Sequence, residues 1–261
     1  MDSPSARVPA QGPSLAVEIA VQSVDGARVA REHGATRVEL CQGLVLGGLT
    51  PSVGAVGVAV SDARAAGATD VHVLIRPRPG DFVFSRSDRY VMERDIDEFG
   101  RLGVAGVVVG ALTEGGTLDR QTIRSLVDAA GDLTVTFHRA IDIAVGGASL
   151  ISELAELGVQ RILTSGRAAS SVDGLDVLSE FVRESAGRVE IMAGGGVTIE
   201  SIPALAAIGV DAVHLSARAA ADRTFGSGPG GGDDGHDVTD AALVAKAVSA
   251  AHGGSPVRWQ S

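Results

Sequence analysis

The sequence contains a single cysteine and a single lysine in 261 residues. With Cys41 alone, no disulfide can form within one chain, which is typical of proteins from a reducing compartment. The N-terminus lacks a charged segment followed by an apolar run, and no apolar run is long enough to span a membrane. We therefore expect a cytoplasmic protein with no membrane partner. Lys246 falls in a predicted surface helix, so a Schiff-base mechanism, which needs a desolvated lysine, is not expected.

Aromatic residues are also scarce, at 3% of the chain. Alanine, valine, leucine and isoleucine must therefore fill the core, which suits the layered packing of a parallel barrel. The formal net charge is −10. Because an acidic surface repels the phosphate backbone of nucleic acids, we expect no nucleic-acid partner.

Three segments are rich in glycine, serine, proline and other residues that bury little apolar surface. They predict a disordered N-terminal lead over residues 1–14, a flexible Gly-rich loop over about 222–237, and a tail over 253–261. The rest of the chain, residues 15–252, is long enough for one domain.

Within that domain, eight short β-branched runs alternate with helical patterns. The predicted strands are 17–21, 37–40, 71–75, 106–109, 133–138, 161–164, 189–193 and 212–215. The predicted helices are 23–33, 52–66, 89–102, 120–130, 148–157, 174–184, 199–208 and 239–251. Ser23, Ser52 and Thr198 are start signals for three of these helices, and several helices end in a glycine that leads into the next strand.

Eight such units in one domain predict a single (β/α)8 TIM barrel, an α/β fold, in preference to a doubly wound open sheet. An open sheet that binds a dinucleotide would carry G-x-G-x-x-G after its first strand. The segment at that place, AVQSVDGARVA, does not fit, so no nucleotide cofactor is predicted.

Charged and polar residues stand on the strands or just after them, where TIM barrels place their active sites. The candidate catalytic residues are Glu18, Glu39, Arg76, His138, Arg139 and Asp142. Glu18 and Glu39 are flanked by apolar residues, so their side chains are expected to point into the barrel, with the arginines and histidines as partners. His138 is a candidate general base that Glu39 or Asp142 would orient. The alternative interpretation is a structural ion network.

A second set of residues suits an anion. The run of glycines after the seventh strand opens a predicted helix, and TIM barrels often bind phosphate after strands seven and eight. The candidate anion-binding residues are Ser165, Gly166, Gly194, Gly195, Gly196 and Ser216. A tight turn that needs glycine is the alternative interpretation.

Metal binding is a third prediction. Cys41, His138 and His214 offer soft or borderline ligands that suit Cu(I), although any such site must be assembled by the fold. An isolated cysteine is also common as a small buried hydrophobic residue.

Five blocks carry a family resemblance. They are VELCQGLVLGGLTPSVG at 38–54, IRPRPGDFVFS at 75–85, VTFHRAID at 135–142, ILTSG at 162–166 and IMAGGGV at 191–197. In this order they resemble the CutC family of copper homeostasis proteins. The resemblance implies a TIM barrel, a cytoplasmic location and copper as the bound ion. It also implies that Cys41 is a copper ligand, paired in the family with a first-strand cysteine at the position of Ala20.

Two functions follow. The first is a CutC-type copper homeostasis protein in which Cys41 is the principal ligand. The second is a TIM-barrel enzyme that acts on a small anionic, for example phosphorylated, metabolite by acid/base chemistry. A homo-oligomer is compatible with either function, and for the copper function it would allow a metal site between subunits.

Overall fold

The computed structural model describes residues 15–67, 70–221 and 236–253. The predicted lead over 1–14, residues 222–235 of the predicted Gly-rich loop and residues 254–261 of the predicted tail lie outside this range.

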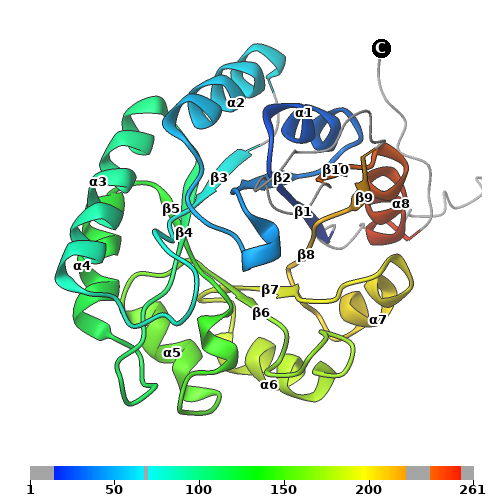
Figure 1. Ribbon diagram of the computed structural model, residues 1–261. Coiled ribbons are helices and arrows are strands. Elements are labelled where there is room, and N and C mark those ends of the chain that lie inside the picture. Colours follow the sequence, from blue (N-terminus) through cyan, green and yellow to red (C-terminus); the bar gives the residue numbers. More distant parts are fainter. Residues whose placement is uncertain (1–14, 68–69, 222–235, 254–261) are drawn as a thin grey trace, which may run out of the picture.

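Eight parallel strands close into a barrel in sequence order, which confirms the predicted TIM barrel. The strands are β1 (Ala16–Val21), β2 (Arg37–Leu40), β3 (Asp70–Leu74), β4 (Gly106–Val109), β5 (Thr134–Phe137), β6 (Arg161–Thr164), β7 (Glu190–Gly194) and β8 (Ala212–Leu215). The barrel closes where β8 pairs with β1, with His214 opposite Glu18. Figure 1 shows the helices as a ring around the strands.

Eight helices follow the strands. They are α1 (Val24–Glu32), α2 (Val53–Ala66), α3 (Arg86–Leu102), α4 (Arg120–Ala130), α5 (Ser149–Glu156), α6 (Leu175–Ser185), α7 (Ile202–Ala207) and α8 (Ala241–Ala251). Ser23 and Ser52 cap α1 and α2 as predicted. Helix α3 begins three residues before the predicted start at 89, because Ser85 and Asp88 form a capping box. Before α7, Thr198 caps a short 3₁₀ turn, Ile199–Ser201.

The strands alternate strictly between an outer and an inner face. The outer face carries β-branched and other apolar residues, such as Val17 and Ile19, which pack with the helices in the main core. The inner face carries buried charged residues, among them Glu18 and Glu39, which were expected to point into the barrel, and Arg37. It also carries two small apolar clusters, made by Cys41, Leu74 and Val108 and by Leu163, Met192 and Ala212. The barrel therefore encloses buried charge.

A two-stranded antiparallel sheet, which the sequence did not predict, follows the barrel. It pairs β9 (Arg218–Ala220) with β10 (Asp237–Thr239), so the end of the predicted 222–237 loop is a strand. Helix α1 packs closely on β10, since a Cβ at Gly26 would lie 2.6 Å from Oγ1 of Thr239. None of the helices among the described residues has the length and apolar character needed to cross a membrane.

Candidate functional site

Glu18 is the centre of the buried charge. It lies on β1 with its side chain inside the barrel and inaccessible to solvent. Nε of Arg37, from β2, donates to Oε2 of Glu18 at 2.9 Å. Nδ1 of His214, from β8, lies 2.7 Å from Oε1 of Glu18. The carboxylate therefore joins three neighbouring strands. Its histidine partner is one of those predicted, whereas its arginine partner is Arg37 rather than the predicted Arg76 or Arg139.

These contacts decide the charge on both groups. Burial alone would raise the pKa of Glu18, but the hydrogen bond and charge of His214, with Arg37, together hold this pKa well below its ordinary value. For His214, burial alone would lower the pKa, but the hydrogen bond to Glu18 and the nearby charge of Glu39 raise it. A glutamate anion and a histidine that favours its cationic form thus face each other.

Glu39, the register partner of Ala20 on β1, completes this group. Ligand atoms of Glu18, Glu39 and His214 all lie within 4.8 Å of one another. Burial, and then the charge of Glu18, outweigh the attraction of His214 and raise the pKa of Glu39 to about 7. Its buried Oε2 atom has no hydrogen-bond partner in the described part of the chain. We call Glu18, Glu39 and His214 the carboxylate–histidine triad.

Deeper in the barrel lies an ion network that sequence reasoning missed. Arg37 also lies 3.8 Å from Glu190, and Nε of Arg161 donates to the same carboxylate. Burial lowers the pKa of the neighbouring His72 to about 4. The signal was available, because Arg37 and Glu39 are alternate residues of β2 and must point to the same side of the strand.

Arg76, just beyond β3, has a different role from the predicted one. Its Nη1 atom donates to the carbonyl oxygens of Leu46 and Gly48 at 2.9 and 3.0 Å, and Nη2 donates to that of Gly80 at 2.7 Å. Arg76 therefore fixes the loops after β2 and β3. Its guanidinium also lies over the ring of Phe82, 5.2 Å from the centroid.

His138, just beyond β5, is held by the backbone. Its Nδ1 atom accepts a hydrogen bond from the amide of Ala140 at 3.2 Å, as the N-cap of a 3₁₀ turn, Arg139–Asp142. The ring stacks obliquely on Phe82, with centroids 4.6 Å apart. Burial, and then the charge of Arg76, lower the pKa of His138 to about 3. The imidazole is neutral, and neither predicted carboxylate is hydrogen-bonded to it.

Asp142 instead holds the loop after β6. It accepts hydrogen bonds from the hydroxyl of Thr164 at 2.6 Å and from the amides of Ser165 and Arg167 at 3.1 and 3.2 Å. Nε of Arg139 donates to Asp142 at 2.9 Å. The donors predicted to bind an external anion at Ser165 are therefore used by a carboxylate of the protein itself. Gly166, next in this loop, has φ +67°, a conformation that favours glycine.

The glycine run after β7 is shaped by close packing. A Cβ at Gly194 would lie 2.3 Å from Cδ1 of Leu163, and one at Gly195 would lie 2.8 Å from the Arg139 guanidinium carbon. Gly195 and Gly196 also have φ values of +100° and +64°. These observations account for the glycines, so an anion site there remains a prediction.

Cys41 is not part of the carboxylate–histidine triad. Its thiol is fully buried with Leu74 and Val108, and its Sγ donates to the carbonyl oxygen of Val21 at 3.6 Å. Burial, and then the charge of Glu39, raise the pKa of this thiol. In the described ranges, no group of three metal-ligating residues that contains Cys41 or His138 comes within 4.8 Å.

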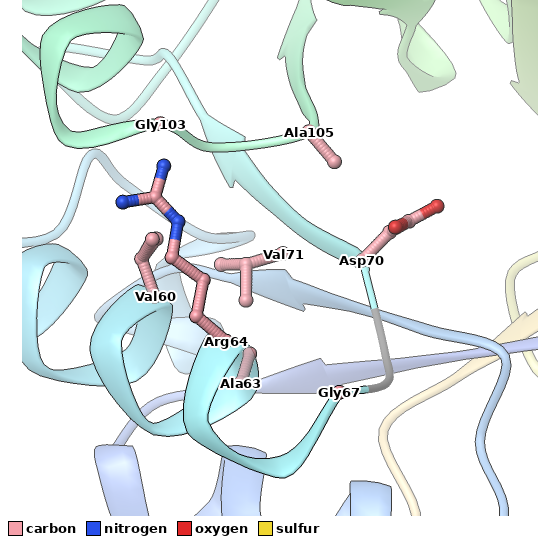
Figure 2. Close-up of a pocket in the computed structure, with 8 residues that line it drawn as sticks. All are labelled: Val60, Ala63, Arg64, Gly67, Asp70, Val71, Gly103 and Ala105. Carbon is pink, nitrogen blue, oxygen red and sulfur yellow. The ribbon is translucent and has the colours of Figure 1, made fainter.

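Two hollows lie at opposite ends of the barrel. One, of about 460 Å³, is bounded by Ala20, Ser216, the start of α1 and the β9–β10 sheet. Ala20 and Ser216 lie two residues after Glu18 and His214 in the chain, and none of the three triad residues lines this cavity. The other, of about 260 Å³, lies at the amino end of β3, and Figure 2 shows Arg64 reaching across it toward Gly103. Barrel enzymes do not use that end for chemistry.

Comparison with known proteins places the chain in a family. The model of the CutC family matches residues 15–219. A CutC family protein from Xanthomonas axonopodis pv. citri is 45% identical over 205 residues, which cover 78% of this chain and 84% of that protein. One from Xylella fastidiosa (strain Temecula1) is 42% identical over 243 residues, covering 91% and 89%.

A crystal structure gives the same result. The protein from Streptococcus agalactiae, provisionally named copper homeostasis protein CutC, superposes with a TM-score of 0.73 at 31% identity, covering 77% of this chain and 98% of that one. The resemblance seen in the five sequence blocks is thereby confirmed, and the chain belongs to the CutC family.

Proposed function

We propose that this protein takes part in copper homeostasis by binding a divalent copper ion at the carboxylate–histidine triad. The proposal depends mainly on the environment of the Glu39 carboxyl group. Its Oε2 atom is buried and unpartnered in the described residues, within 4.8 Å of the ligand atoms of Glu18 and His214. A buried oxygen acceptor without a donor is costly, and a cation would satisfy it.

The donor chemistry favours Cu²⁺ over Cu(I). Two carboxylates and one imidazole are hard or borderline ligands, whereas Cu(I) prefers thiolates and thioethers. Among divalent first-row metals, a site of nitrogen and oxygen ligands binds Cu²⁺ most tightly. Cys41 does not fit the two-thiolate site that the family resemblance implies, because Ala20 replaces its partner and the thiol is buried in its protonated form.

Access supports the same site. The side chain of His214 is 15% exposed. The cavity of about 460 Å³ is lined by Ala20 and Ser216, which lie two residues after Glu18 and His214. A metal site needs such an entry path in addition to suitable ligands.

The test is a Cu²⁺ titration against a competing chelator, followed by electron paramagnetic resonance. Glu39→Gln keeps the shape of the side chain but removes a ligand charge, so we expect copper affinity to fall by about tenfold to a hundredfold or more. The spectrum of the wild type should show coupling to one imidazole nitrogen.

Two variants act as controls. Glu114→Gln changes an exposed carboxylate in the turn after β4 and should leave the affinity unchanged. Cys41→Ala should also leave it unchanged. Loss of binding in Cys41→Ala with retention in Glu39→Gln would reverse the assignment and restore the cysteine site that the family implies.

A further inference from the structure

Two buried N–H groups at the carboxyl ends of β3 and β5 have no acceptor among the residues described. They are Nε of Arg76 and Nε2 of His138. We propose that these two groups bind the carboxylate of a small organic molecule beneath Phe82, at a site separate from the carboxylate–histidine triad. Neither the triad nor the family's copper role calls for such a ligand.

The hydrogen bond from Ala140 determines what His138 can do. Because the Ala140 amide donates to Nδ1, the neutral ring carries its proton on Nε2. His138 is therefore a hydrogen-bond donor toward the barrel mouth, and the general-base role predicted for it does not suit this tautomer. A neutral histidine held at the start of a helical turn serves as a donor to substrate oxygen in triosephosphate isomerase.

Arg76 supplies the positive charge. Its residue is 6% exposed, and within the described ranges no carboxylate lies within 4.0 Å of its guanidinium. The hydrogen-bond acceptors of its side chain are three neutral carbonyl groups, so its charge is buried without a counter-ion among the described residues. An uncompensated buried charge is unfavourable, and an anionic ligand removes that cost.

The number of free donors indicates the kind of anion. Both N–H groups on Nη1 of Arg76 and one of the two on Nη2 donate to carbonyl oxygens, so Nε is the guanidinium nitrogen left without an acceptor, and His138 offers one N–H. These two nitrogens without an acceptor match the two oxygens of a carboxylate. A phosphate has more oxygens, and burying it would leave acceptors unpaired.

Phe82 completes the site. The centroid of its ring lies 4.6 Å from that of His138 and 5.2 Å from the guanidinium carbon of Arg76, so both donor side chains are neighbours of the same phenyl ring. Gly110 makes room for the imidazole itself, since a Cβ there would lie 2.3 Å from Cε1 of His138. The ligand would reach the donors when the half-buried Phe82 side chain turns aside.

The test is long-range ¹H–¹⁵N NMR of the histidine rings in the full chain, during titration with sodium acetate against sodium chloride at equal ionic strength. We expect the His138 Nε2 resonance to shift and saturate with acetate. His138→Gln keeps a donor near the position of Nε2, and should retain acetate binding by thermal shift. His138→Asn keeps the acceptor that caps Ala140 but loses the Nε2 donor, and should bind acetate about tenfold more weakly.

Three results would overturn the proposal: an Nε2 resonance unchanged by acetate, equal acetate affinity in the Asn and Gln variants, or tighter binding of sodium phosphate than of acetate. The first would mean that water satisfies both donors. The third would assign the site to phosphate esters. Because no copper is present, these results are independent of the titration of the triad, and Glu114→Gln should bind acetate like the wild type.

Discussion

Arg37 and Glu18 form an ion pair inside the barrel, with Nε of Arg37 2.9 Å from Oε2 of Glu18 and side chains that are 6% and 0% exposed. Such a pair contributes little compared with a well-packed apolar pair, but losing one partner leaves the other charge buried and alone. Glu18 is also one of the proposed copper ligands, so its carboxylate serves both the buried ion pair and the proposed metal site.

Replacement of Glu18 by glutamine should therefore destabilise the protein strongly. We expect the free energy of unfolding in urea to fall by about 3–5 kcal/mol, because Arg37 and the histidine at position 214 lose their anion. Asp25→Asn is the matched control, since the Asp25 side chain is 88% exposed in its pair with Arg28 and should change stability by less than about 1 kcal/mol. Similar effects of the two changes would contradict the buried pair.

A methyl group on β4 should be poorly tolerated. A Cβ at Gly106 would lie 2.4 Å from Nδ1 of His72 and 2.5 Å from the backbone oxygen of Thr134. Gly106→Ala should lower the melting temperature, with a loss of about 1–3 kcal/mol from overpacking. Gly57→Ala, inside α2 with no atom nearer than 3.9 Å, should raise stability by up to about 1 kcal/mol. If Gly106→Ala were more stable than Gly57→Ala, the close packing around Gly106 in the barrel wall would be contradicted.

Acid should destabilise the fold partly through His72. Burial lowers its pKa from 6.5 to about 4 in the folded state. Between these pH values the unfolded chain binds a proton that the folded chain does not, so stability is fully present above pH 6.5 and is lost as pH falls toward 4. The loss from this one group is about 1.4 kcal/mol per pH unit.

Urea unfolding at several pH values measures this slope. In His72→Gln position 72 no longer titrates, so the dependence of stability on pH between 4 and 6.5 should become correspondingly shallower. An identical slope in the wild type and the variant would rule out His72 as the group responsible.

The thiol of Cys41 should be inert in the folded protein. It is fully buried, and burial raises its pKa, so little of the reactive thiolate exists near neutral pH. Reaction with a colorimetric disulfide reagent should proceed only as fast as the protein unfolds, and should accelerate in urea. A second protein, Cys41→Ala with Ser61→Cys on the exposed face of α2, should react at once. Rapid labelling of native Cys41 would mean that metal could also reach it.

Much of the fold could be predicted because its signals are local. The β-branched runs and the glycines that end helices fix the eight strands to within two residues, as at β2 and β6, whose bounds match the prediction. The β9–β10 sheet was missed because its two strands have three residues each and are too short for a periodic pattern.

The site was predicted only in part, because its contacts depend on loop conformation. Strand parity correctly indicated that Glu18 and Glu39 point inward. No sequence pattern could show that Arg76 binds three loop carbonyls, or that Asp142 collects the amides of the loop after β6. The charged residues that were expected to form one cluster therefore form two separate groups. One lies on β1, β2 and β8, and the other lies at the ends of β3 and β5.

The contact between Glu18 and His214 joins residues 196 positions apart in the sequence. During synthesis on the ribosome, seven strands emerge before the eighth can supply this histidine. The ligand set is consequently incomplete in every nascent or half-folded chain, and contacts of such long separation form slowly. Copper capture at the triad would thus be restricted to finished molecules, and a bound ion would fasten the first strand to the last.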